Sequence, residues 1–309
     1  MIINYSDQEV LKNQKSIFLA GPTPREERVK SWRGEACQIL ENIGFDGVVY
    51  VPEYSTMKPR GEYNDQVMWE REALANASVI VIWLARSLPD MPAFTTNGEF
   101  GYWIHTGKVL YGRPDTAVKI RYYDWLYDLD MHYEPYHNLS DLLEKAVQLA
   151  NEVGVNKYTE ILPVDKRIIM RKNHSKIEKI YVAHSKQIPY EEELYKPIRQ
   201  DEELKQYDII LPHENNVYQN HTRDFYRSLD LVIAEASDRA TGLGIELGFA
   251  FDDNTPIYCI YHKGIVPNNS LHSVTDYFYE YDNSSEMIQT IKNIIQEEKE
   301  RVYQKNMKR

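Results

Sequence analysis

The sequence predicts two α/β domains in tandem, each a parallel sheet flanked by helices in the flavodoxin-like or Rossmann-like manner. Short apolar segments bounded by Gly or Pro alternate with segments of helical periodicity. The order of these segments in the first half of the chain recurs in the second half. Strands that alternate with helices are typical of parallel sheets, which bind ligands at the carboxyl ends of their strands.

The first half is expected to contain four strands and four helices. Its first strand, KSIFLAG, ends in Gly-Pro, and VIVIWLA is apolar throughout, as in a fully buried strand. Gly44, Gly107 and Gly154 follow helical segments and are good helix stops. The expected strands are residues 15–21, 47–53, 79–85 and 108–112, and the expected helices are 25–45, 64–78, 95–107 and 139–154.

The second half follows the same order, with a helix that Pro197 is expected to kink or break. A mixed, basic segment separates the halves and has room for one strand or helical turn around residues 167–170. We expect a first domain at 1–155, a linker at 156–177 and a second domain at 178–309. The expected strands are 179–185, 207–214, 231–237 and 256–263, and the expected helices are 190–206, 221–230, 242–254 and 284–305.

Composition limits which binding partners and which cellular location we expect for the protein. The 309 residues carry a formal net charge of −11, which disfavours nucleic acid as a partner. A small anionic ligand remains open, because backbone amides and a few basic side chains can hold a phosphate. Cys37 and Cys259 are too few for a disulfide framework, and no apolar run is long enough to span a bilayer. With no signal-peptide pattern at the N-terminus, we expect a cytoplasmic protein that does not bind membranes.

A glutamate stands inside an apolar, glycine-rich run, ATGLGIELGFAFDDNTPI. If the helix begins near Gly242, Glu246 lies in its first turn, where free backbone N–H groups favour an ionised carboxylate. Gly244 and Gly248 remove side chains and let a ligand approach. This environment suits a nucleophile or a base that stabilises an anion, whereas the alternative is a glutamate that only caps the helix.

The first half offers a matching arrangement. Glu99 follows the buried strand VIVIWLA and stands in TTNGEFGYW. Glu70, on the preceding helix, is placed to meet Glu99 over the edge of the sheet. Two carboxylates in one pocket are the usual apparatus for cleaving glycosidic bonds. The alternative for Glu70 is a solvated position on the helix surface.

Other motifs are weak. His132 and His137 lack metal-binding spacing, and the chain has no phosphate-binding Walker A motif. GLGIELG lacks the glycine order of a dinucleotide fingerprint. The segment DLDMHYEPYHN is expected to be a surface loop or a lid over a substrate.

The sequence resembles the nucleoside 2-deoxyribosyltransferase-like family. In the first half the resemblance covers residues 15–114 and is carried by IFLAGPTPR, SWRGEACQIL, GFDGVVYVPE, QVMWEREALANASVIVIWLAR and TTNGEFGYW. The second half resembles the same family over residues 179–261, through KIYVAHS and RDFYRSLDLVIAEASDRATGLGIELGFA. This second copy is nearer to the branch that hydrolyses 2′-deoxynucleoside 5′-phosphates.

The resemblance implies a reaction and roles for individual residues. Enzymes of the family attack C1′ of the deoxyribose with a glutamate, release the base and pass the sugar to another base or to water. The nucleophile would be Glu99 in the first half and Glu246 in the second. The acidic residue of the preceding helix would be Glu70 and, in the second half, Asp224 or alternatively Thr222.

Both halves depart from the family pattern. The aromatic residue of the first strand corresponds to Phe18 and Tyr181, and Phe18 lacks the hydroxyl that usually positions the nucleophile. Ala93 and Ala240 stand where the family carries an Asp or Ser that contacts the sugar or its phosphate, and Asn97 and Thr241 are possible substitutes. Arg25 and Lys186 are candidates for a 5′-phosphate or else surface charges. The substrate-binding candidates are Phe18, Gly21, Pro22, Arg25, Asn97, Tyr181, Ser185, Thr241, Gly242 and Gly244.

The resulting hypothesis is an enzyme that cleaves or transfers the N-glycosidic bond of a nucleoside or nucleotide, with no metal or redox cofactor implied. Two alternatives remain open: a nucleotide-binding sensor whose carboxylates hold ribose hydroxyls, and a glycohydrolase of a larger nucleotide such as NAD. Either half is a candidate for the catalytic one. Because family members complete each pocket with residues of a neighbouring subunit, we expect a homo-oligomer or an intramolecular pseudo-dimer of the two halves.

Overall fold

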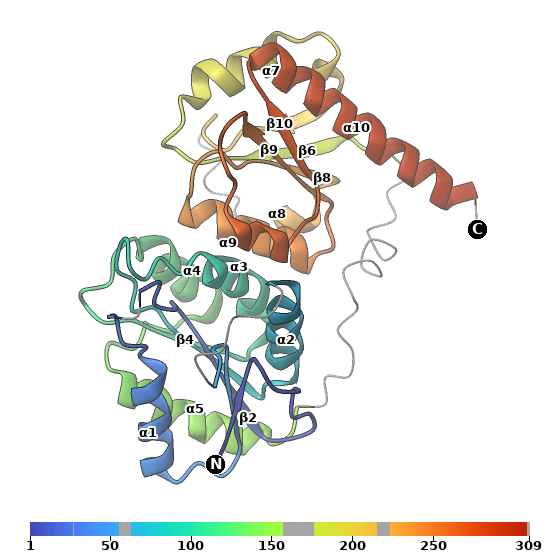
Figure 1. The fold of residues 1–309 in the computed structure, drawn as a ribbon. Coiled ribbons are helices and arrows are strands. Elements are labelled where there is room, and N and C mark those ends of the chain that lie inside the picture. The colour runs from blue at the N-terminus through green and yellow to red at the C-terminus, as the bar shows by residue number, and fades with distance from the viewer. Residues whose placement is uncertain (27, 56–62, 157–175, 215–222, 308–309) are drawn as a thin grey trace. The chain divides into compact units, whose positions relative to one another are not determined.

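The computed structural model divides the chain into two compact units, Met1–Leu162 and Pro163–Arg309. The described residues are 1–26, 28–55, 63–156, 176–214 and 223–307. The expected linker at 156–177 lies almost entirely outside them, as does the strand or turn expected at 167–170. Each unit contains one sheet with helices on both faces (Figure 1).

Unit 1 has a five-stranded sheet in the order β1-β3-β2-β4-β5, and all of its pairings are parallel. The central strands β2 and β4 are buried at every position, as their apolar sequences require. The strands are β1 (Ile2–Tyr5), β2 (Ser16–Ala20), β3 (Val48–Val51), β4 (Val79–Trp83) and β5 (Val109–Gly112).

The helices of unit 1 form two layers around this sheet (Figure 1). One face packs against α1 (Arg33–Ile43) and α5 (Leu139–Val153) in an apolar core. Gly44 ends α1 in the left-handed conformation, as expected for a stop glycine. The other face carries the helices α2 (Tyr63–Asn76), α3 (Phe94–Trp103) and α4 (Arg121–Met131).

Unit 2 also has a five-stranded parallel sheet, in the order β10-β9-β8-β6-β7. One face packs on the π-type turn Glu191–Tyr195, α7 (Lys196–Gln200) and α10 (Ser284–Met307). The other carries α8 (Arg223–Arg227) and α9 (Thr241–Asp252). The strands are β6 (Lys179–Ala183), β7 (Asp208–Ile210), β8 (Leu231–Glu235), β9 (Ile257–His262) and β10 (Phe278–Tyr281).

Four strands have the same order in both units: β3-β2-β4-β5 in unit 1 corresponds to β7-β6-β8-β9 in unit 2. The predicted fold class, two α/β domains with parallel sheets, is therefore confirmed. The fifth strand differs, because β1 extends one edge of the first sheet and β10 extends the opposite edge of the second. Neither of these short edge strands was expected from the sequence.

The helices give one further difference from the sequence prediction and one agreement with it. The segment expected to be a loop or lid at 128–138 begins inside α4, whose residues Tyr123, Leu126 and Tyr127 are buried against the unit. Two of these three buried residues are tyrosines, so the helix lacks the aliphatic periodicity that would predict it from sequence. In unit 2 the expected helix at 190–206 is broken as predicted, with Pro197 in the first turn of α7 and a separate 3₁₀ turn at Leu204–Gln206.

Candidate active sites at the carboxyl edges of the two sheets

Glu99 and Glu246 occupy the same place in the two units. Each is the sixth residue of the helix that follows the central strand, in α3 and α9 respectively. The expectation that Glu246 lies in the first helical turn is wrong, because α9 begins at Thr241 and has no acidic residue in its first turn. One further turn of helix moves the carboxylate away from the free N–H groups, so other contacts must explain its state.

In unit 2 that contact is a tyrosine hydroxyl. Tyr181 Oη donates a hydrogen bond to Glu246 Oε2 at 2.9 Å. Burial raises the pKa of Glu246 to about 8, and the Tyr181 hydrogen bond opposes this rise. Glu246 is thus a carboxyl group in an apolar setting, with one hydroxyl that favours its ionised form.

Phe18 is the counterpart of Tyr181 in unit 1. Phe18 pairs with Ile80 in the register of β2 and β4, as Tyr181 pairs with Val232 in β6 and β8. The Phe18 ring is fully buried and packs against Trp69 with a centroid separation of 6.3 Å. Unit 1 therefore places an apolar ring where unit 2 has a hydroxyl donor.

In unit 1 a second carboxyl group, that of Glu70, affects the ionisation of Glu99. Burial raises the pKa of Glu99, and the negative charge of Glu70 raises it further. The pKa of Glu70 is also raised by burial, while a hydrogen bond from Gln66 Nε2 to Glu70 Oε1 at 2.9 Å lowers it. The two carboxyl groups lie in one electrostatic environment, in which one ionised group disfavours ionisation of the other.

Arg33 fixes the Gly-Pro loop beside these carboxyl groups, and the sequence analysis did not identify it. Its guanidinium is buried, forms an ion pair with Glu53 at 2.7 Å and donates to the carbonyls of Leu19, Gly21 and Pro22. Its positive charge lowers the pKa of both Glu70 and Glu99. A charged residue on the buried face of the helix, beside Trp32, was the available signal.

Gly21 is required by the geometry of this loop. Its φ is +149°, and a Cβ atom there would lie 2.4 Å from the Trp83 carbonyl oxygen. The adjacent Pro22 carbonyl accepts from the Trp32 indole at 3.2 Å as well as from Arg33. The loop after β2 is consequently held against the end of β4, where the backbones approach closely.

Arg25, a phosphate candidate, lies farther along the same loop. Its backbone N–H donates to the Asp90 carbonyl at 3.1 Å, which joins this loop to the one after β4. Its exposed guanidinium lies 5.6 Å from the ring centroid of Phe94, the first residue of α3. Its role toward a phosphate stays a prediction.

Asn97 is engaged within unit 1. Its Oδ1 accepts from Arg86 Nη2 at 2.5 Å and from the Tyr123 hydroxyl at 2.8 Å. Arg86 also donates to the carbonyl of Ala93, which has a left-handed φ of 55°. Arg86 was not identified from the sequence, and its buried guanidinium fixes the first turn of α3, the helix that bears Glu99.

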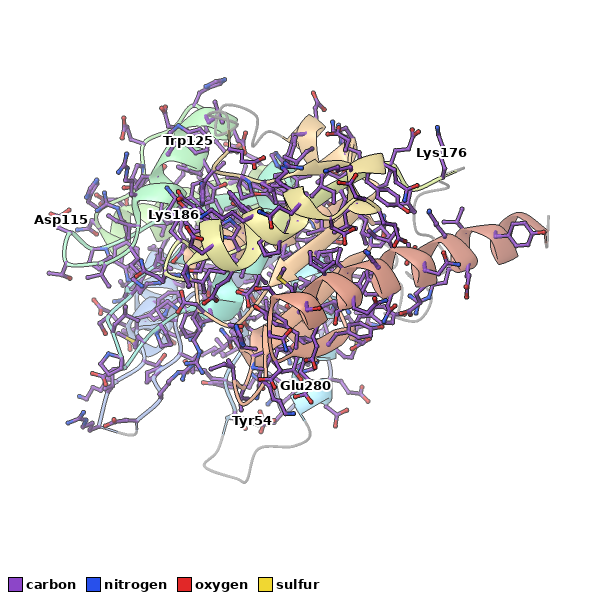
Figure 2. All side chains as sticks on the ribbon, turned by 90° about the horizontal axis from the view of Figure 1, so that it is seen from above. Tyr54, Asp115, Trp125, Lys176, Lys186 and Glu280 are labelled. Atoms are coloured by element: carbon purple, nitrogen blue, oxygen red, sulfur yellow. The ribbon has the colours of Figure 1, made fainter. Side chains whose placement is uncertain are left out.

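The remaining candidates of unit 2 are distributed over three segments. Thr241, Gly242 and Gly244 lie in the first turn of α9. Lys186, labelled in Figure 2, is exposed on the loop after β6. The Asp224 side chain is 90% exposed and forms an ion pair with Arg227 at 3.4 Å, and Thr222 lies outside the described residues.

Ser185 lies at the carboxyl end of β6, where it is buried and donates through Oγ to Asp238 Oδ2 at 2.5 Å. Asp238 belongs to the loop between β8 and α9 and was not identified from the sequence. Asp238 lies eight residues before Glu246, whereas the family's Asp or Ser was expected six residues before it, at Ala240. Only the fold, by bringing β6 beside β8, shows the pairing of Ser185 with Asp238.

Neither a metal-ligand cluster nor a membrane-spanning helix occurs among the described residues. Within residues 1–26, 28–55, 63–156, 176–214 and 223–307, no three His, Cys, Asp or Glu side chains are grouped to hold a metal ion. No helix in the same ranges has the length and apolar character needed to cross a membrane.

Comparison with known proteins gives one family. Residues 14–116 match the family described as nucleoside 2-deoxyribosyltransferase like. The matched segment lies within unit 1 and includes Phe18, Glu70 and Glu99. No curated protein matches the chain. The match supports glycosyl transfer at a coarse level, and the resemblance of the second half to the same family stays a prediction.

Proposed function

We propose that this protein cleaves or transfers the N-glycosidic bond of a deoxynucleoside or related nucleotide through a glutamate nucleophile. The observation that carries the proposal is the equivalent placement of Glu99 and Glu246, each on the helix after the central strand of its sheet. The similarity of residues 14–116 to the nucleoside 2-deoxyribosyltransferase-like family supports the same class of reaction.

The reaction has two displacements at C1′ of the sugar. In the first, a carboxylate oxygen of the glutamate forms a bond to C1′ while the C1′–N bond breaks, and the leaving nitrogen keeps the electron pair and takes a proton from an acid or from water. In the second, water or the nitrogen of another base attacks C1′, loses a proton and displaces the carboxylate. Water gives hydrolysis, and a second base gives transfer.

Unit 2 has the better equipped nucleophile. The Tyr181 hydroxyl fixes one oxygen of Glu246 and favours the ionised form that must attack. We therefore assign the covalent step to Glu246 and expect any turnover in unit 1 to be slower.

A second function, nucleotide binding without turnover, is favoured for unit 1 by one observation. Phe18 replaces the tyrosine, so the hydroxyl that contacts Glu99 belongs to Thr96 on the same helix and not to the central strand. A protonated Glu99 can instead donate a hydrogen bond to an acceptor on the ligand. Unit 1 would then bind a nucleoside or nucleotide without converting it.

Base release from a mixed substrate pool tests both functions. The full-length protein is incubated with deoxynucleosides, their 5′-monophosphates and NAD, and free bases are followed by chromatography. Release that is lost in Glu246→Gln and kept in Glu99→Gln supports catalysis in unit 2 and binding in unit 1. Saturable nucleoside binding without release from any compound would instead replace the enzyme with a sensor.

A further inference from the structure

Four rings cluster at the carboxyl ends of β6 and β7, beside the loop that follows β6. His184 directly follows β6, and His213 lies three residues after β7. Tyr190 precedes the π-type turn Glu191–Tyr195, and Tyr195 ends it. The ring centroid of His184 lies 4.7 Å from that of Tyr190, 5.3 Å from that of Tyr195 and 5.0 Å from that of His213. His184 is 6% exposed, so the other three rings cover its imidazole.

The hydrogen bonds of His184 identify its neutral tautomer. Nδ1 lies 2.9 Å from the Ser185 carbonyl oxygen, which can only accept, so Nδ1 carries the proton. Nε2 is then an acceptor, and the Tyr195 hydroxyl donates to it at 2.7 Å. The same hydroxyl oxygen accepts from the His213 backbone N–H at 3.0 Å. A directed chain of hydrogen bonds therefore runs from His213 through Tyr195 and His184 to the loop after β6.

This chain forms only while His184 is neutral. A protonated imidazole donates from both nitrogens, so Nε2 can no longer accept from Tyr195 and the hydroxyl must turn its hydrogen elsewhere. Burial lowers the pKa of His184 from its ordinary value of 6.5, the hydrogen bond to Ser185 opposes this change, and the positive charge of Lys186 adds to it. Protonation therefore favours an open arrangement in which water reaches the ring.

Other titratable groups face this cluster. Glu193, on the π-type turn, pairs with His262 at the end of β9, and its Oε2 lies 3.7 Å from Nε2 of His262. A protonated His262 attracts Glu193, so acid strengthens this contact and does not release the turn. The tyrosine hydroxyls gain no charge in acid, and Lys186 is already positive. Protonation of His213 would oppose a charge on His184, so the variants below separate these two histidines.

We propose that His184 and Tyr195 form an acid-sensitive switch between the π-type turn and the loop after β6, closed while His184 is neutral and open once it is protonated. Because the open state takes up the proton more readily, opening increases as pH falls below about 6.5. Tyr181, which donates to Glu246, lies three residues before His184, so opening affects the end of the strand that holds the glutamate. Regulation of turnover by the switch rests on the proposed function of unit 2.

Hydrogen exchange of the His213 amide reports the switch without requiring turnover. Residue-resolved exchange of the full-length protein is measured at pH 5.5 and 7.0 and corrected for the intrinsic pH dependence of exchange. We expect opening to be about tenfold more frequent at pH 5.5, as for one proton taken up by an open state whose histidine has an ordinary pKa. His184→Gln keeps an acceptor for the Tyr195 hydroxyl but cannot be protonated, so its protection should be nearly equal at both pH values.

Three further variants identify the group that titrates. Tyr195→Phe removes the hydroxyl and keeps the ring, so protection of the amide at position 213 should be low at both pH values. His213→Gln and His262→Gln each remove another histidine and should keep the change of about tenfold. Equal protection of the wild type at both pH values, or a change that persists in His184→Gln, overturns the switch.

The imidazole resonances of the wild type give a test that needs no variant. We expect the pKa of His184 to lie below 6.5, because burial opposes its charged form. His272, which is exposed in the same unit, is the internal reference. A His184 pKa at or above 6.5 contradicts the proposal, whether or not His184→Gln folds.

Base release separates the switch from the proposed function. The ratio of kcat/KM between the wild type and His184→Gln should fall about threefold or more from pH 7.0 to 5.5, and this ratio cancels the ionisation of Glu246 that both proteins share. A constant ratio overturns regulation of the site, even where exchange depends on pH. An absence of base release from every protein removes the proposed function and leaves the exchange test of the switch intact.

Discussion

The two units share one scaffold but surround their glutamates differently. Glu246 accepts a hydrogen bond from the Tyr181 hydroxyl, whereas in unit 1 the corresponding strand position is Phe18 and Glu99 is influenced by a second carboxyl group, Glu70. The Tyr181 hydrogen bond lowers the pKa of Glu246 in unit 2. In unit 1 the Glu70 charge raises the pKa of Glu99, while Arg33 and a hydrogen bond with Thr96 lower it. Burial raises the pKa of both glutamates to about 8, so the comparison shows that different neighbouring side chains surround one shared backbone position and one shared cause of the shift.

The loops that follow β2 in unit 1 and β6 in unit 2 also differ. Gly21 of unit 1 and His184 of unit 2 each follow the strand position that corresponds between β2 and β6. Gly21 is fixed through its carbonyl by Arg33. His184 Nε2 lies 2.7 Å from the Tyr195 hydroxyl, and burial lowers the pKa of this imidazole. Unit 1 thus stabilises its loop with a buried charge, and unit 2 with a neutral ring.

The largest effect is expected from the nucleophiles. Glu246→Gln removes the attacking oxygen charge and should lower base release by about 10³-fold or more. Glu99→Gln should change base release little if unit 1 binds a ligand without converting it. Glu280→Gln, an exposed carboxyl group labelled in Figure 2, is the matched control. Equal losses in the Glu99 and Glu246 variants would remove the functional difference between the units.

The next largest effect is expected on the free energy of unfolding, from a substitution in the loop after β2 of unit 1. Gly21→Ala adds a Cβ atom 2.4 Å from the Trp83 carbonyl at a φ that L-residues rarely adopt, and we expect a loss of about 2–4 kcal/mol in the free energy of unfolding. Gly34→Ala is the control, because a Cβ there meets nothing within 4 Å and its position is helical. Denaturant unfolding measures both, and equal midpoints would show that the loop is not tightly held.

A tyrosine exchange tests the comparison at the glutamates directly. Tyr181→Phe gives unit 2 the ring of unit 1, and the pKa of Glu246 should rise further because a hydrogen bond to its ionised form is lost. Since the nucleophile must be ionised, kcat/KM for base release should increase as pH rises through about 8 in the wild type and level off above it.

In Tyr181→Phe this increase should move upward by about one pH unit, the equivalent of one hydrogen bond to a charged group. The pH–rate profiles of both proteins, measured with one nucleoside, give the shift. A profile that does not move would show that the Tyr181 hydroxyl does not control ionisation of Glu246.

The smallest effect is on the pH dependence of stability. The folded pKa of Glu246, about 8, exceeds its ordinary value of 4.5, so between these pH values the folded state holds a proton that the unfolded state has lost. Stability therefore decreases as pH rises through this window. Glu246→Gln cannot ionise, and its decrease between pH 5 and 8 should be smaller by about 1–2 kcal/mol, after allowance for partial solvent contact.

Unfolding curves at several pH values measure this difference. Glu280→Gln again serves as the control, because an exposed carboxyl group should leave the wild-type slope unchanged. A variant slope equal to that of the wild type would contradict the raised pKa of Glu246.

The sequence by itself determined the repeated order of strands and helices and the matching positions of Glu99 and Glu246. Apolar runs such as VIVIWLA and LVIAEAS specify buried parallel strands, because only a strand covered on both faces needs continuous apolar residues. The stop glycines, including Gly44, follow from local backbone conformation and need no distant contacts. Edge strands as short as β1 and β10 carry too few apolar residues to be recognised in this way.

Tertiary structure decided the contacts that give the site its chemistry. The bonds of Tyr181 with Glu246 and of Ser185 with Asp238 join residues more than 50 positions apart, and Arg33 acts on carbonyls that precede its helix. Burial likewise depends on how helices cover a sheet, and it is the largest cause of the raised pKa of Glu246. A local pattern indicates which residue types are present, but hydrogen-bond partners and desolvation arise only when distant segments pack together.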